Sequence, residues 1–518
     1  MIHFFALSAY DLLVIGSGFG GTMAAAPAVF AGRRVLMIEA GGWVARGPDN
    51  WGPAGFADAT PSYNRDYPID VRSGGRTSPL GTYLNVGGAS VFYGGVAMRM
   101  READFHPDPQ IDQQSGARWP YGYADLEPFY TEAERLLEVA GDTGADPTDP
   151  PRSAPFPQAP GPLAPISTRL ADAARALDLH PFRLPLAINY MPGAGRTPCP
   201  ACGTCDGYAC AVQAKNDLAT VLLPRLQRAG LELAINTAAV RINVNDDGRR
   251  VTGVTAMRRP SGDIVTFEAR AVVVAAGAIA TPRLLLASGL EALNPAGDAI
   301  GRYLMRHCNA VVLGVFPFRP APDREFHKQL AIHDFYFGHP SITAPAGRLG
   351  CLQQFATPAP WVTRGRLPLG LGSLIGPALA FTTGLIVIAE DRPQAANRVV
   401  LAEAPALGIP RVVVSHHYDA RDLAARSALV GVARRILRQA GALFSVKYPV
   451  DTFSHAVGTV RMGVDPHSSP LDAWGAFRGL GNLFVTDGSA LPRSGGVNPS
   501  LTIAANALRS GTHVLETI

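Results

Sequence analysis

One glycine-rich turn constrains the fold of this chain more than any other feature. A short apolar run after Tyr10 is followed by Gly-Ser-Gly-Phe-Gly-Gly at residues 16–21, and then by an alanine-rich stretch typical of a helix. Gly16 allows a tight turn, Gly18 lets the backbone approach a pyrophosphate, and Gly21 lets the helix lie close to the strand. A second apolar run ends in Glu39, where a carboxylate can bind ribose hydroxyls. The stretch predicts a Rossmann-like unit that binds a dinucleotide.

Glu39 limits which dinucleotides the site can bind, but it does not identify one. A carboxylate at the end of the second strand suits an unphosphorylated ribose, which both FAD and NAD carry. The positive end of the following helix would face the phosphates in either case. The choice between the two depends on other segments of the chain.

Composition excludes several classes of protein. The chain has 518 residues, 47% of them hydrophobic, which is enough for a large core and more than one domain. A net charge of +4, from 46 basic and 42 acidic residues, gives no basis for binding nucleic acid or a membrane surface. We find no apolar run of the length that spans a membrane. The apolar N-terminal stretch lacks a basic region, so we expect mature, cytoplasmic protein rather than a signal peptide.

Further along the chain, two more glycine-rich stretches adjoin patterns of secondary structure. Residues 83–100 hold glycines at 87, 88, 94 and 95, which can let the backbone lie flat against a planar ligand. Residues 482–487 resemble a strand, and a glycine-rich turn leads from them to Asn498, Pro499 and a helical run. Several strands separated by turn signals are expected between residues 231 and 276, and a second β-rich region between 310 and 415.

Several motifs together resemble the glucose–methanol–choline oxidoreductase family. The stretch GAIATPRLLLASGLE at residues 277–291 is similar to the family's second signature, and VGGASVFYGGVAMR at 86–99 resembles the first signature region more loosely, with Ala89 in place of a small hydroxyl residue. WPYGYADLEPFY, IGRYLMRH and EDRPQAANRVVL follow in the family's order. SHAVGTVRMG and NLFVTDGSALPRSGGVNPSLTIAANAL resemble its C-terminal active-site half. The resemblance covers nearly the whole chain.

The resemblance implies an α/β fold with two domains. A discontinuous Rossmann-like FAD-binding domain would comprise residues 8–118, 205–305 and 450–518. A second α+β domain, built on an antiparallel sheet and binding the substrate, would comprise residues 119–204 and 306–449. The branch that acts on sugar or aminocyclitol hydroxyls in bacterial secondary metabolism, which is paromamine dehydrogenase-like, resembles this chain most.

The resemblance also implies FAD as the cofactor and alcohol oxidation as the reaction. The residues expected to bind FAD lie in the glycine-rich loops and at the strand ends beside them: Gly16, Gly18, Phe19, Gly20, Gly21, Glu39, Ala40, Gly88, Ser90, Gly94, Gly95, Val240, Ala276, Gly277, Asp487, Gly488, Asn498 and Pro499. The helix after Pro499 would direct its positive end toward the flavin ring, where it stabilises negative charge on the reduced flavin.

Alcohol oxidation needs a base for the hydroxyl proton as well as a hydride acceptor. Histidine suits the role of base because its unperturbed pKa is ~6.5. Twelve histidines are present, and composition cannot rank them. In the family that the chain resembles, the position of His455 carries the active-site histidine, and the partner position is His or Asn, here Asn498. We therefore expect His455 to accept the proton and Asn498 to orient the substrate oxygen, whereas His467 lies in a turn-like context and is expected to be structural.

Four of the six cysteines gather in the segment CPACGTCDGYAC, at positions 199, 202, 205 and 210. Their spacing approaches an iron–sulfur pattern, but the last gap is one residue longer than in bacterial ferredoxins and no proline follows. A bound cluster or metal, disulfides, and reduced thiols all remain open. We expect no metal.

We expect a small-molecule alcohol as the substrate, and oxygen or another carrier as the electron acceptor. Within the same family, a sterol or aryl-alcohol oxidase is an alternative. An NAD-linked dehydrogenase would share the first glycine motif but would not explain residues 277–291 or the pair formed by His455 and Asn498. A flavin-binding protein without catalytic activity would not need that pair either.

Overall fold

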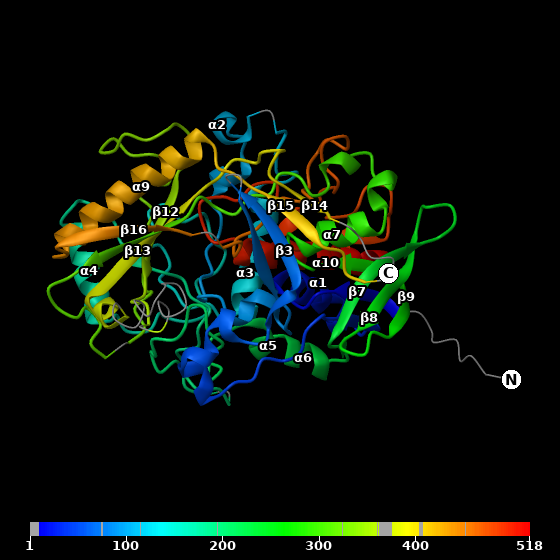
Figure 1. Cartoon of the computed structure of the whole chain (residues 1–518), viewed down its shortest axis with the longest axis horizontal. Coiled ribbons are helices and arrows are strands. Elements are labelled where there is room, and N and C mark those ends of the chain that lie inside the picture. The colour runs from blue at the N-terminus through cyan, green and yellow to red at the C-terminus, as the bar shows by residue number, and fades with distance from the viewer. Residues whose placement is uncertain are drawn as a thin grey trace.

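The computed structural model describes residues 10–73, 76–113, 115–193, 195–323, 325–359, 361, 376–402, 408–450 and 452–518. The N-terminal stretch that we interpret as mature protein begins outside these residues. Two sheets lie toward opposite ends of the long axis, and a third lies between them (Figure 1). Among the described residues, no helix combines the length and the apolar composition that crossing a bilayer requires.

A seven-stranded sheet carries the first glycine motif. Its order is β6-β2-β1-β9-β8-β7, and β17 pairs with β9. Strands β1, β2, β6 and β17 and the second half of β9 run parallel, whereas β7, β8 and the first half of β9 form an antiparallel extension. The strands are β1 Tyr10–Ile15, β2 Val35–Ile38, β6 Glu232–Ala234, β7 Thr237–Val244, β8 Val251–Arg258, β9 Ile264–Val274 and β17 Leu483–Val485. This sheet confirms the predicted Rossmann-like unit.

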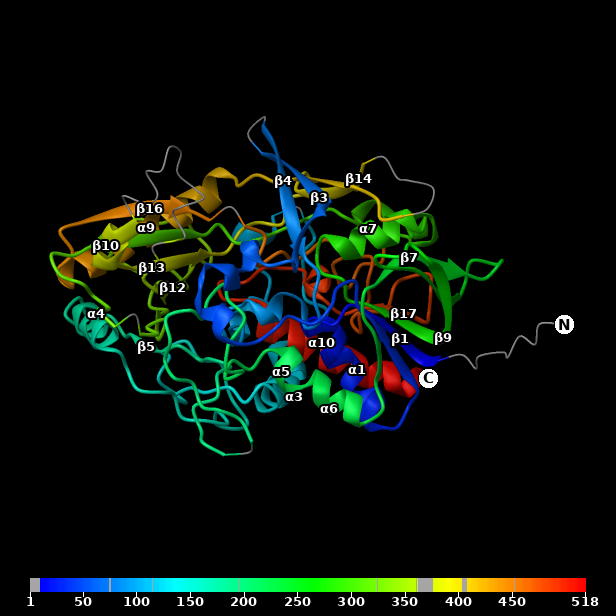
Figure 2. The same ribbon diagram turned by 60° about the horizontal axis from the view of Figure 1, so that its bottom comes forward.

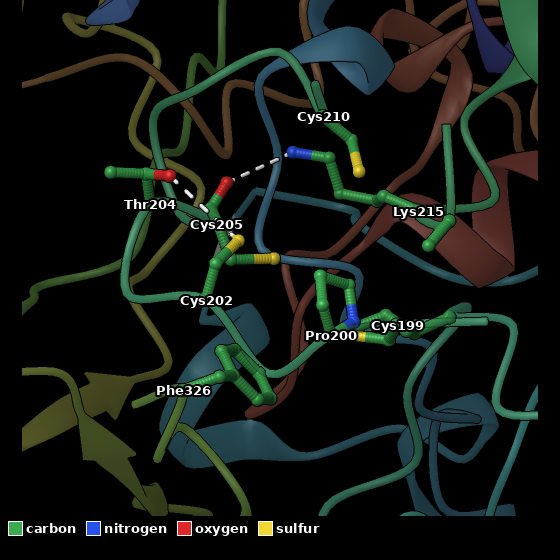
Figure 3. A pocket seen from close by; sticks show the side chains of 10 residues that line it. Cys199, Pro200, Cys202, Thr204, Cys205, Cys210, Lys215 and Phe326 are labelled. Atoms are coloured by element: carbon green, nitrogen blue, oxygen red, sulfur yellow. Dashed lines mark hydrogen bonds between the residues drawn. The ribbon is translucent and has the colours of Figure 1, made fainter. Parts of the chain in front are cut away.

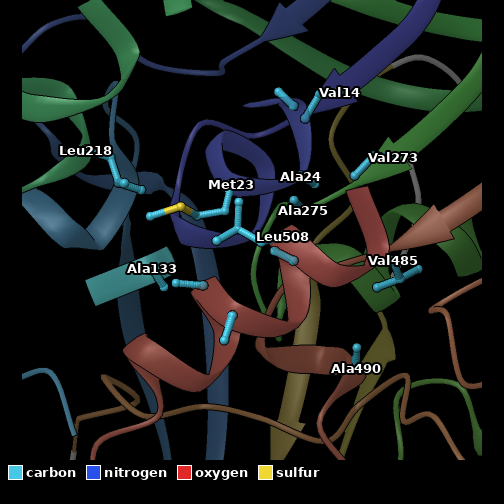
Figure 4. Packing of buried hydrophobic residues seen from close by; sticks show 14 of the residues in the cluster. Val14, Met23, Ala24, Ala133, Leu218, Val273, Ala275, Val485, Ala490 and Leu508 are labelled. Atoms are coloured by element: carbon cyan, nitrogen blue, oxygen red, sulfur yellow. The ribbon is translucent and has the colours of Figure 1, made fainter. Parts of the chain in front are cut away.

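Two helices cover the parallel part of this sheet and approach each other closely. Helix α1 (Phe19–Phe30) packs along the C-terminal helix α10 (Ser500–Thr517), and Met23 and Leu508 lie side by side between them (Figure 4). A Cβ on Gly511 of α10 would lie 2.4 Å from the carbonyl oxygen of Ala24. The alanine-rich sequence of α1 and the glycine of α10 therefore let the two backbones meet. Helix α3 (Tyr123–Leu136) packs on the other side of α10.

A six-stranded antiparallel sheet forms the core of the second region, as predicted. Its order is β16-β10-β13-β12-β11-β5. Helix α9 (Ala420–Gln439) packs on this sheet and α4 (Pro165–Arg175) on α9, and their apolar side chains share one core with the strands. The strands are β5 Phe182–Arg183, β10 Ala310–Val315, β11 Leu330–Ile332, β12 Gly350–Phe355, β13 Thr382–Ala389 and β16 Phe444–Pro449.

A four-stranded sheet links the two predicted domains, which the sequence did not indicate. Its order is β14-β15-β3-β4, comprising Arg398–Leu401, Val412–Ser415, Tyr63–Ser73 and Arg76–Tyr83. It stands between the two larger sheets (Figure 2). Strands β3 and β4 belong to the predicted FAD-binding segments, whereas β14 and β15 belong to the predicted substrate-binding segments. The predicted fold class is confirmed, and the domain boundaries remain a prediction.

Within the described residues, the remaining α-helices are short and lie in the connections. They are α2 Pro109–Asp112, α5 Leu218–Val221, α6 Leu223–Arg228 and α7 Ala280–Ala287. Helix α7 follows the end of β9 and so begins beside the first glycine loop, because β9 is the neighbour of β1 in the sheet.

Candidate active site

The loop between β1 and α1 leaves open space in front of Gly18. A Cβ built on Gly18 would meet no protein atom within 4 Å, and the φ of −72° at this residue is ordinary for any amino acid. A Cβ on Gly21 would instead lie 1.9 Å from the carbonyl oxygen of Gly16, and one on Gly20 would lie 2.8 Å from the Cα of Asp487. The space lies at the start of a twelve-residue helix, whose first N–H groups lack intrahelical acceptors. It fits a pyrophosphate in shape and charge.

Segments that are distant in the sequence meet at this loop. A Cβ on Gly88 would lie 3.2 Å from the Cα of Gly18, and a Cβ on Gly16 would lie 2.4 Å from the carbonyl oxygen of Ala275 and 3.3 Å from the Cα of Ala276. Together with the contact between Gly20 and the backbone at residue 487, this brings four predicted cofactor segments into one place.

The carboxylate of Glu39 ties the first loop to the end of β2. It accepts hydrogen bonds from the backbone N–H of Ser17 (3.1 Å), from the Ser17 hydroxyl (2.6 Å) and from the N–H of Gly41 (3.0 Å). Burial raises the pKa of this carboxyl, and these hydrogen bonds oppose the shift. The neighbouring Ala40 accepts a hydrogen bond through its carbonyl oxygen from Arg259 (3.1 Å).

Strand β7 reaches the same corner of the site. The N–H of Thr237, the first residue of β7, donates to the carbonyl oxygen of Glu39 (2.8 Å). Val240 lies three residues further along this strand and is buried. Val240 therefore lies on the strand whose first residue is bonded to Glu39, and a contact of Val240 with a nucleotide remains a prediction.

Asp487 is fully engaged with protein donors. Its carboxylate accepts from the N–H of Gly277 (2.8 Å), from Thr281 Oγ1 (2.5 Å), and from the N–H (2.8 Å) and hydroxyl (2.5 Å) of Ser489. Thr281 Oγ1 in turn accepts the N–H of Ala276 (3.1 Å). The side chain thus fastens two predicted cofactor segments to each other, and any contact of residues 487–488 with FAD would come from their backbone.

The second glycine-rich stretch is also held by its own side chains. The Ser90 hydroxyl donates to the carbonyl oxygen of Gly87 (2.6 Å), so the hydroxyl hydrogen is committed to the loop. A Cβ on Gly94 would lie 2.7 Å from Lys328 Nζ, and Gly95 adopts a φ of +76° that favours glycine. The stretch therefore lies against a lysine that the sequence did not single out.

Lys215 fastens the cysteine-rich segment to this stretch. Its ammonium is buried and donates to the carbonyl oxygens of Tyr93 (2.8 Å), Cys205 (2.9 Å) and Tyr208 (2.7 Å). The ring of Tyr93 meets the ring of Phe19 edge-on, with centroids 5.5 Å apart. Phe19, at the start of α1, is thereby connected through Tyr93 to the cysteines.

The four clustered cysteines line one small pocket with Lys215 and Phe326 (Figure 3). Burial raises the pKa of Cys199 to about 11 and that of Cys205 to about 12, which favours protonated thiols at neutral pH. Within the described part of the chain, no three or more His, Cys, Asp or Glu side chains are arranged to hold a metal ion, and the six cysteines are free thiols. The metal content remains a prediction.

The predicted catalytic pair is brought together. Asn498 Nδ2 lies 3.3 Å from His455 Nε2, although the residues are 43 positions apart. A Cβ on Gly488 would lie 2.9 Å from the carbonyl oxygen of Ala456, so the loop after β17 also lies beside the histidine. Pro499 immediately precedes α10, which places the pair at the positive end of that helix.

A glutamine from the antiparallel sheet orients the asparagine. Gln353 on β12 is fully buried, and its Nε2 donates to Asn498 Oδ1 at 2.6 Å. Because the oxygen of Asn498 is used as an acceptor there, its NH₂ group is directed toward His455. Sequence reasoning missed Gln353, since a polar residue in a strand carries no signal of its own.

A second histidine adjoins the first. His307 Nδ1 lies 2.9 Å from His455 Nδ1, and the two rings stand at 89° to each other. Sequence reasoning missed His307 as a site residue, although the motif IGRYLMRH that ends in it was recognised as a family landmark.

The environment of His455 keeps its imidazole neutral. Burial lowers its pKa well below the usual 6.5, the positive charge of Lys328 lowers it further, and Asp391 opposes this shift. A neutral imidazole at neutral pH has a free nitrogen lone pair, which is the state that a general base requires.

Comparisons with family models match two segments of the chain. Residues 193–309 match the N-terminal model of GMC oxidoreductases, and residues 393–507 match the C-terminal model. The first match ends two residues beyond His307, and the second contains both His455 and Asn498.

Curated relatives match almost the whole chain. Paromamine 6'-oxidase from Streptomyces fradiae is 33% identical over 529 residues, covering 98% of this chain and 91% of the relative. The 6'''-hydroxyparomomycin C oxidase from Streptomyces lividus is 32% identical, covering 97% of this chain and 90% of the relative. Among solved structures, pyridoxine 4-oxidase from Mesorbium loti superposes with a TM-score of 0.68 at 20% identity, covering 97% of this chain and 99% of that one, which is a likeness of fold.

Proposed function

The chain belongs to the glucose–methanol–choline oxidoreductase family, and from this premise we propose that it oxidises a hydroxyl group of an amino sugar or aminocyclitol, with His455 as the base. The observation that carries the catalytic part is the neutral imidazole of His455 held against the amide of Asn498. The proposed substrate class rests on the names of the two relatives, which are oxidases of paromamine and of hydroxyparomomycin.

Family membership confirms the cofactor and the reaction class. The protein is an FAD-dependent oxidoreductase that acts on alcohols, as the sequence motifs implied. The alternative of an NAD-linked dehydrogenase is thereby excluded. The open space at Gly18 is the feature of this chain that would receive the pyrophosphate of FAD.

His455 would take the hydroxyl proton on Nε2. Asn498 would donate an N–H to the substrate oxygen and hold it beside that nitrogen, while Gln353 keeps the amide turned in the required direction. FAD, when bound, accepts the hydride that leaves the carbon bearing the hydroxyl. The negative charge that develops on the substrate oxygen as its proton leaves strengthens its hydrogen bond to Asn498.

The groups around His455 favour a polar substrate over a sterol or a simple aryl alcohol. His455 and Asn498 are both partly exposed to solvent, and their side chains present a ring nitrogen and an amide 3.3 Å apart. Such groups lose water when an apolar ligand covers them and gain no hydrogen bonds in exchange. A hydroxyl-rich or ammonium-bearing substrate can replace that water.

We further infer that molecular oxygen is the electron acceptor, since the two relatives reported above at 33% and 32% identity are named oxidases. To test the substrate and the acceptor, purified holoprotein would be mixed anaerobically with paromamine, glucosamine, benzyl alcohol and cholesterol. Flavin bleaching by paromamine or glucosamine is expected, followed by recovery of the yellow colour and formation of hydrogen peroxide when air is admitted. Bleaching by cholesterol or benzyl alcohol alone would overturn the substrate class, and recovery only with an artificial dye would overturn the acceptor.

The catalytic pair is tested by His455→Ala and Asn498→Ala, with His467→Ala as the matched control because His467 is exposed in a turn. His455→Ala should keep FAD and slow anaerobic flavin reduction by ~10²–10⁴-fold, the usual size of a general-base contribution. Asn498→Ala should slow it less, because one hydrogen bond contributes ~1 kcal/mol, rising toward ~3 kcal/mol if the oxygen carries charge. An unchanged reduction rate in His455→Ala would exclude this residue as the base, and a loss confined to FAD content would make it a support for the cofactor.

A further inference from the structure

We propose that His307 is a positioning residue that fixes the tautomer of His455 and shares the positive charge formed when His455 takes the substrate proton. The proposal rests on the function proposed for His455. Four side chains, Gln353, Asn498, His455 and His307, form a row of hydrogen bonds. The partners at both ends of this row determine which ring nitrogens bear hydrogen.

At the His307 end of this row, the backbone determines which ring nitrogen of His307 bears hydrogen. Its Nε2 lies 3.1 Å from the carbonyl oxygen of Ser494 and 2.9 Å from that of Gly495. Carbonyl oxygens only accept hydrogen bonds, so Nε2 must be the donor. In the neutral ring, Nδ1 of His307 therefore carries a lone pair, and it can only accept from Nδ1–H of His455 at 2.9 Å.

At the Gln353 end of the row, an independent set of hydrogen bonds gives the same tautomer for His455. Gln353 donates to Asn498 Oδ1, so Asn498 presents its NH₂ group to His455 Nε2. Nε2 of His455 must then be the acceptor, and the ring hydrogen must lie on Nδ1. Both ends thus place the lone pair of His455 on Nε2, the nitrogen that is to meet the substrate hydroxyl.

The backbone around His307 is organised to hold this ring in place. His307 has a φ of +62°, a left-handed conformation that is uncommon for a residue other than glycine. The carboxylate of Asp391 accepts the N–H groups of Arg306 (2.9 Å) and His307 (3.1 Å), and the Tyr418 hydroxyl donates to the carbonyl oxygen of His307 (2.7 Å). A costly conformation that three hydrogen bonds maintain beside the reacting groups points to a functional constraint.

The proton balance shows what the second ring contributes. When the substrate O–H bond breaks, an N–H bond forms at Nε2 of His455, and the imidazolium bears one positive charge. Its Nδ1–H then donates to His307 Nδ1 as a charge-assisted hydrogen bond, which is about twice as strong as a neutral one. If that hydrogen crosses to His307, the charge moves to a ring whose Nε2–H already faces two carbonyl oxygens, and Asp391 lies nearby as a counter-charge.

The test compares His307→Leu, which removes the acceptor, with His307→Asn, whose Oδ1 can replace Nδ1. Flavin reduction in each holoenzyme is followed anaerobically with paromamine between pH 5 and 9. His307→Leu should slow reduction about 10- to 100-fold, the effect of losing a hydrogen bond to a charged group, with FAD content retained. His307→Asn should recover most of the rate. Equal rates in wild type and His307→Leu, or no recovery in His307→Asn, would overturn the proposal.

The pH profile separates positioning from simple repulsion. The charged and titratable groups that face His455 are His307, Lys328 and Asp391. If His307 accepts a hydrogen bond from the imidazolium, its loss should move the acid limb of the profile to lower pH. If His307 acts only as a repelling cation, the limb should move to higher pH, which would overturn the proposal.

A measurement on the wild-type protein keeps the proposal testable if a variant fails to fold. Nitrogen-15 NMR of protein labelled at histidine should show the His455 signals of the Nδ1–H tautomer, identified by their loss in His455→Ala. Signals of the Nε2–H tautomer would overturn the proposal. This result is independent of turnover, so failure of His455 as the base, which the kinetics of His455→Ala reports, is distinguishable from failure of His307 to position it.

Discussion

Replacing Gly18 by valine should remove FAD without weakening the protein itself. The space around Gly18 differs from the space around the other glycines of the loop. A Cβ on Gly18 meets no protein atom within 4 Å, whereas a Cβ on Gly21 would lie 1.9 Å from a backbone oxygen. The backbone at Gly18, with φ −72° and ψ −168°, lies in the extended region that β-branched residues favour. Gly18→Val is therefore compatible with the apoprotein, and Gly21→Val is not.

The expected size of the effect follows from the same geometry. In the apoprotein, a residue that replaces glycine without strain stabilises by ~0.4–1 kcal/mol, because it restricts the unfolded chain. In the holoprotein, the side chain would occupy the space in front of α1 that the pyrophosphate needs. Overpacking of this kind costs ~1–3 kcal/mol or more, which corresponds to a dissociation constant for FAD about 5- to 150-fold higher.

The measurement is the FAD content of purified protein together with the melting temperatures of the apo and holo forms. Gly481→Val is the matched control, because a Cβ at this exposed glycine also meets no protein atom within 4 Å. Gly18→Val should lose yellow colour and the stabilisation that bound FAD provides, while its apoprotein melts no lower than the wild type. Full FAD stoichiometry in Gly18→Val, or an apoprotein that melts well below the wild type, would refute this reasoning.

Two further predictions concern protonation and metal content. The rate of flavin reduction should stay level as the pH falls through 6.5 and decline only below it, because burial lowers the pKa of His455 and the base fails only once its imidazole is protonated; stopped-flow measurement of a midpoint at or above 6.5 would contradict this. Elemental analysis of anaerobically prepared protein should find no stoichiometric iron or zinc, because the cysteine spacing departs from the iron–sulfur pattern. About three or four irons per chain would contradict this.

The sequence predicted those parts of the fold and site whose cause is local. The loop at residues 16–21 could be recognised because its glycines lie between a strand and the helix that follows it, in one local unit. The close contacts of Gly16 with Ala275 and of Gly20 with Asp487 were not part of that signal. Glu39 was found for the same reason, since it ends the next strand of that unit. His455 and Asn498 came from the family resemblance, and the structure places their side chains 3.3 Å apart.

Other features could not be predicted because their partners are distant in the sequence. Asp487 and Ser90 were expected to bind FAD, yet the Asp487 carboxylate and the Ser90 hydroxyl are committed to protein groups that no local pattern specifies. Gln353 has its partner Asn498 145 positions away, and His307 has His455 148 positions away. A single sequence contains no signal for such pairs, because each depends on how two distant segments of the chain meet.

The reacting groups of the site and the groups that orient them come from different parts of the fold. The two groups proposed to touch the substrate, His455 and Asn498, lie in the C-terminal segment beside the parallel sheet. The two groups that orient them lie on or next to the antiparallel sheet: Gln353 is on β12, and His307 is three residues before β10. In this arrangement the antiparallel sheet fixes the direction of each reacting hydrogen bond without supplying the reacting atoms. Substitutions on that sheet should therefore alter the rate and pH dependence of flavin reduction while leaving FAD bound. Substitutions in the glycine loop should lower the FAD content, while the protein that still holds FAD keeps its pH dependence.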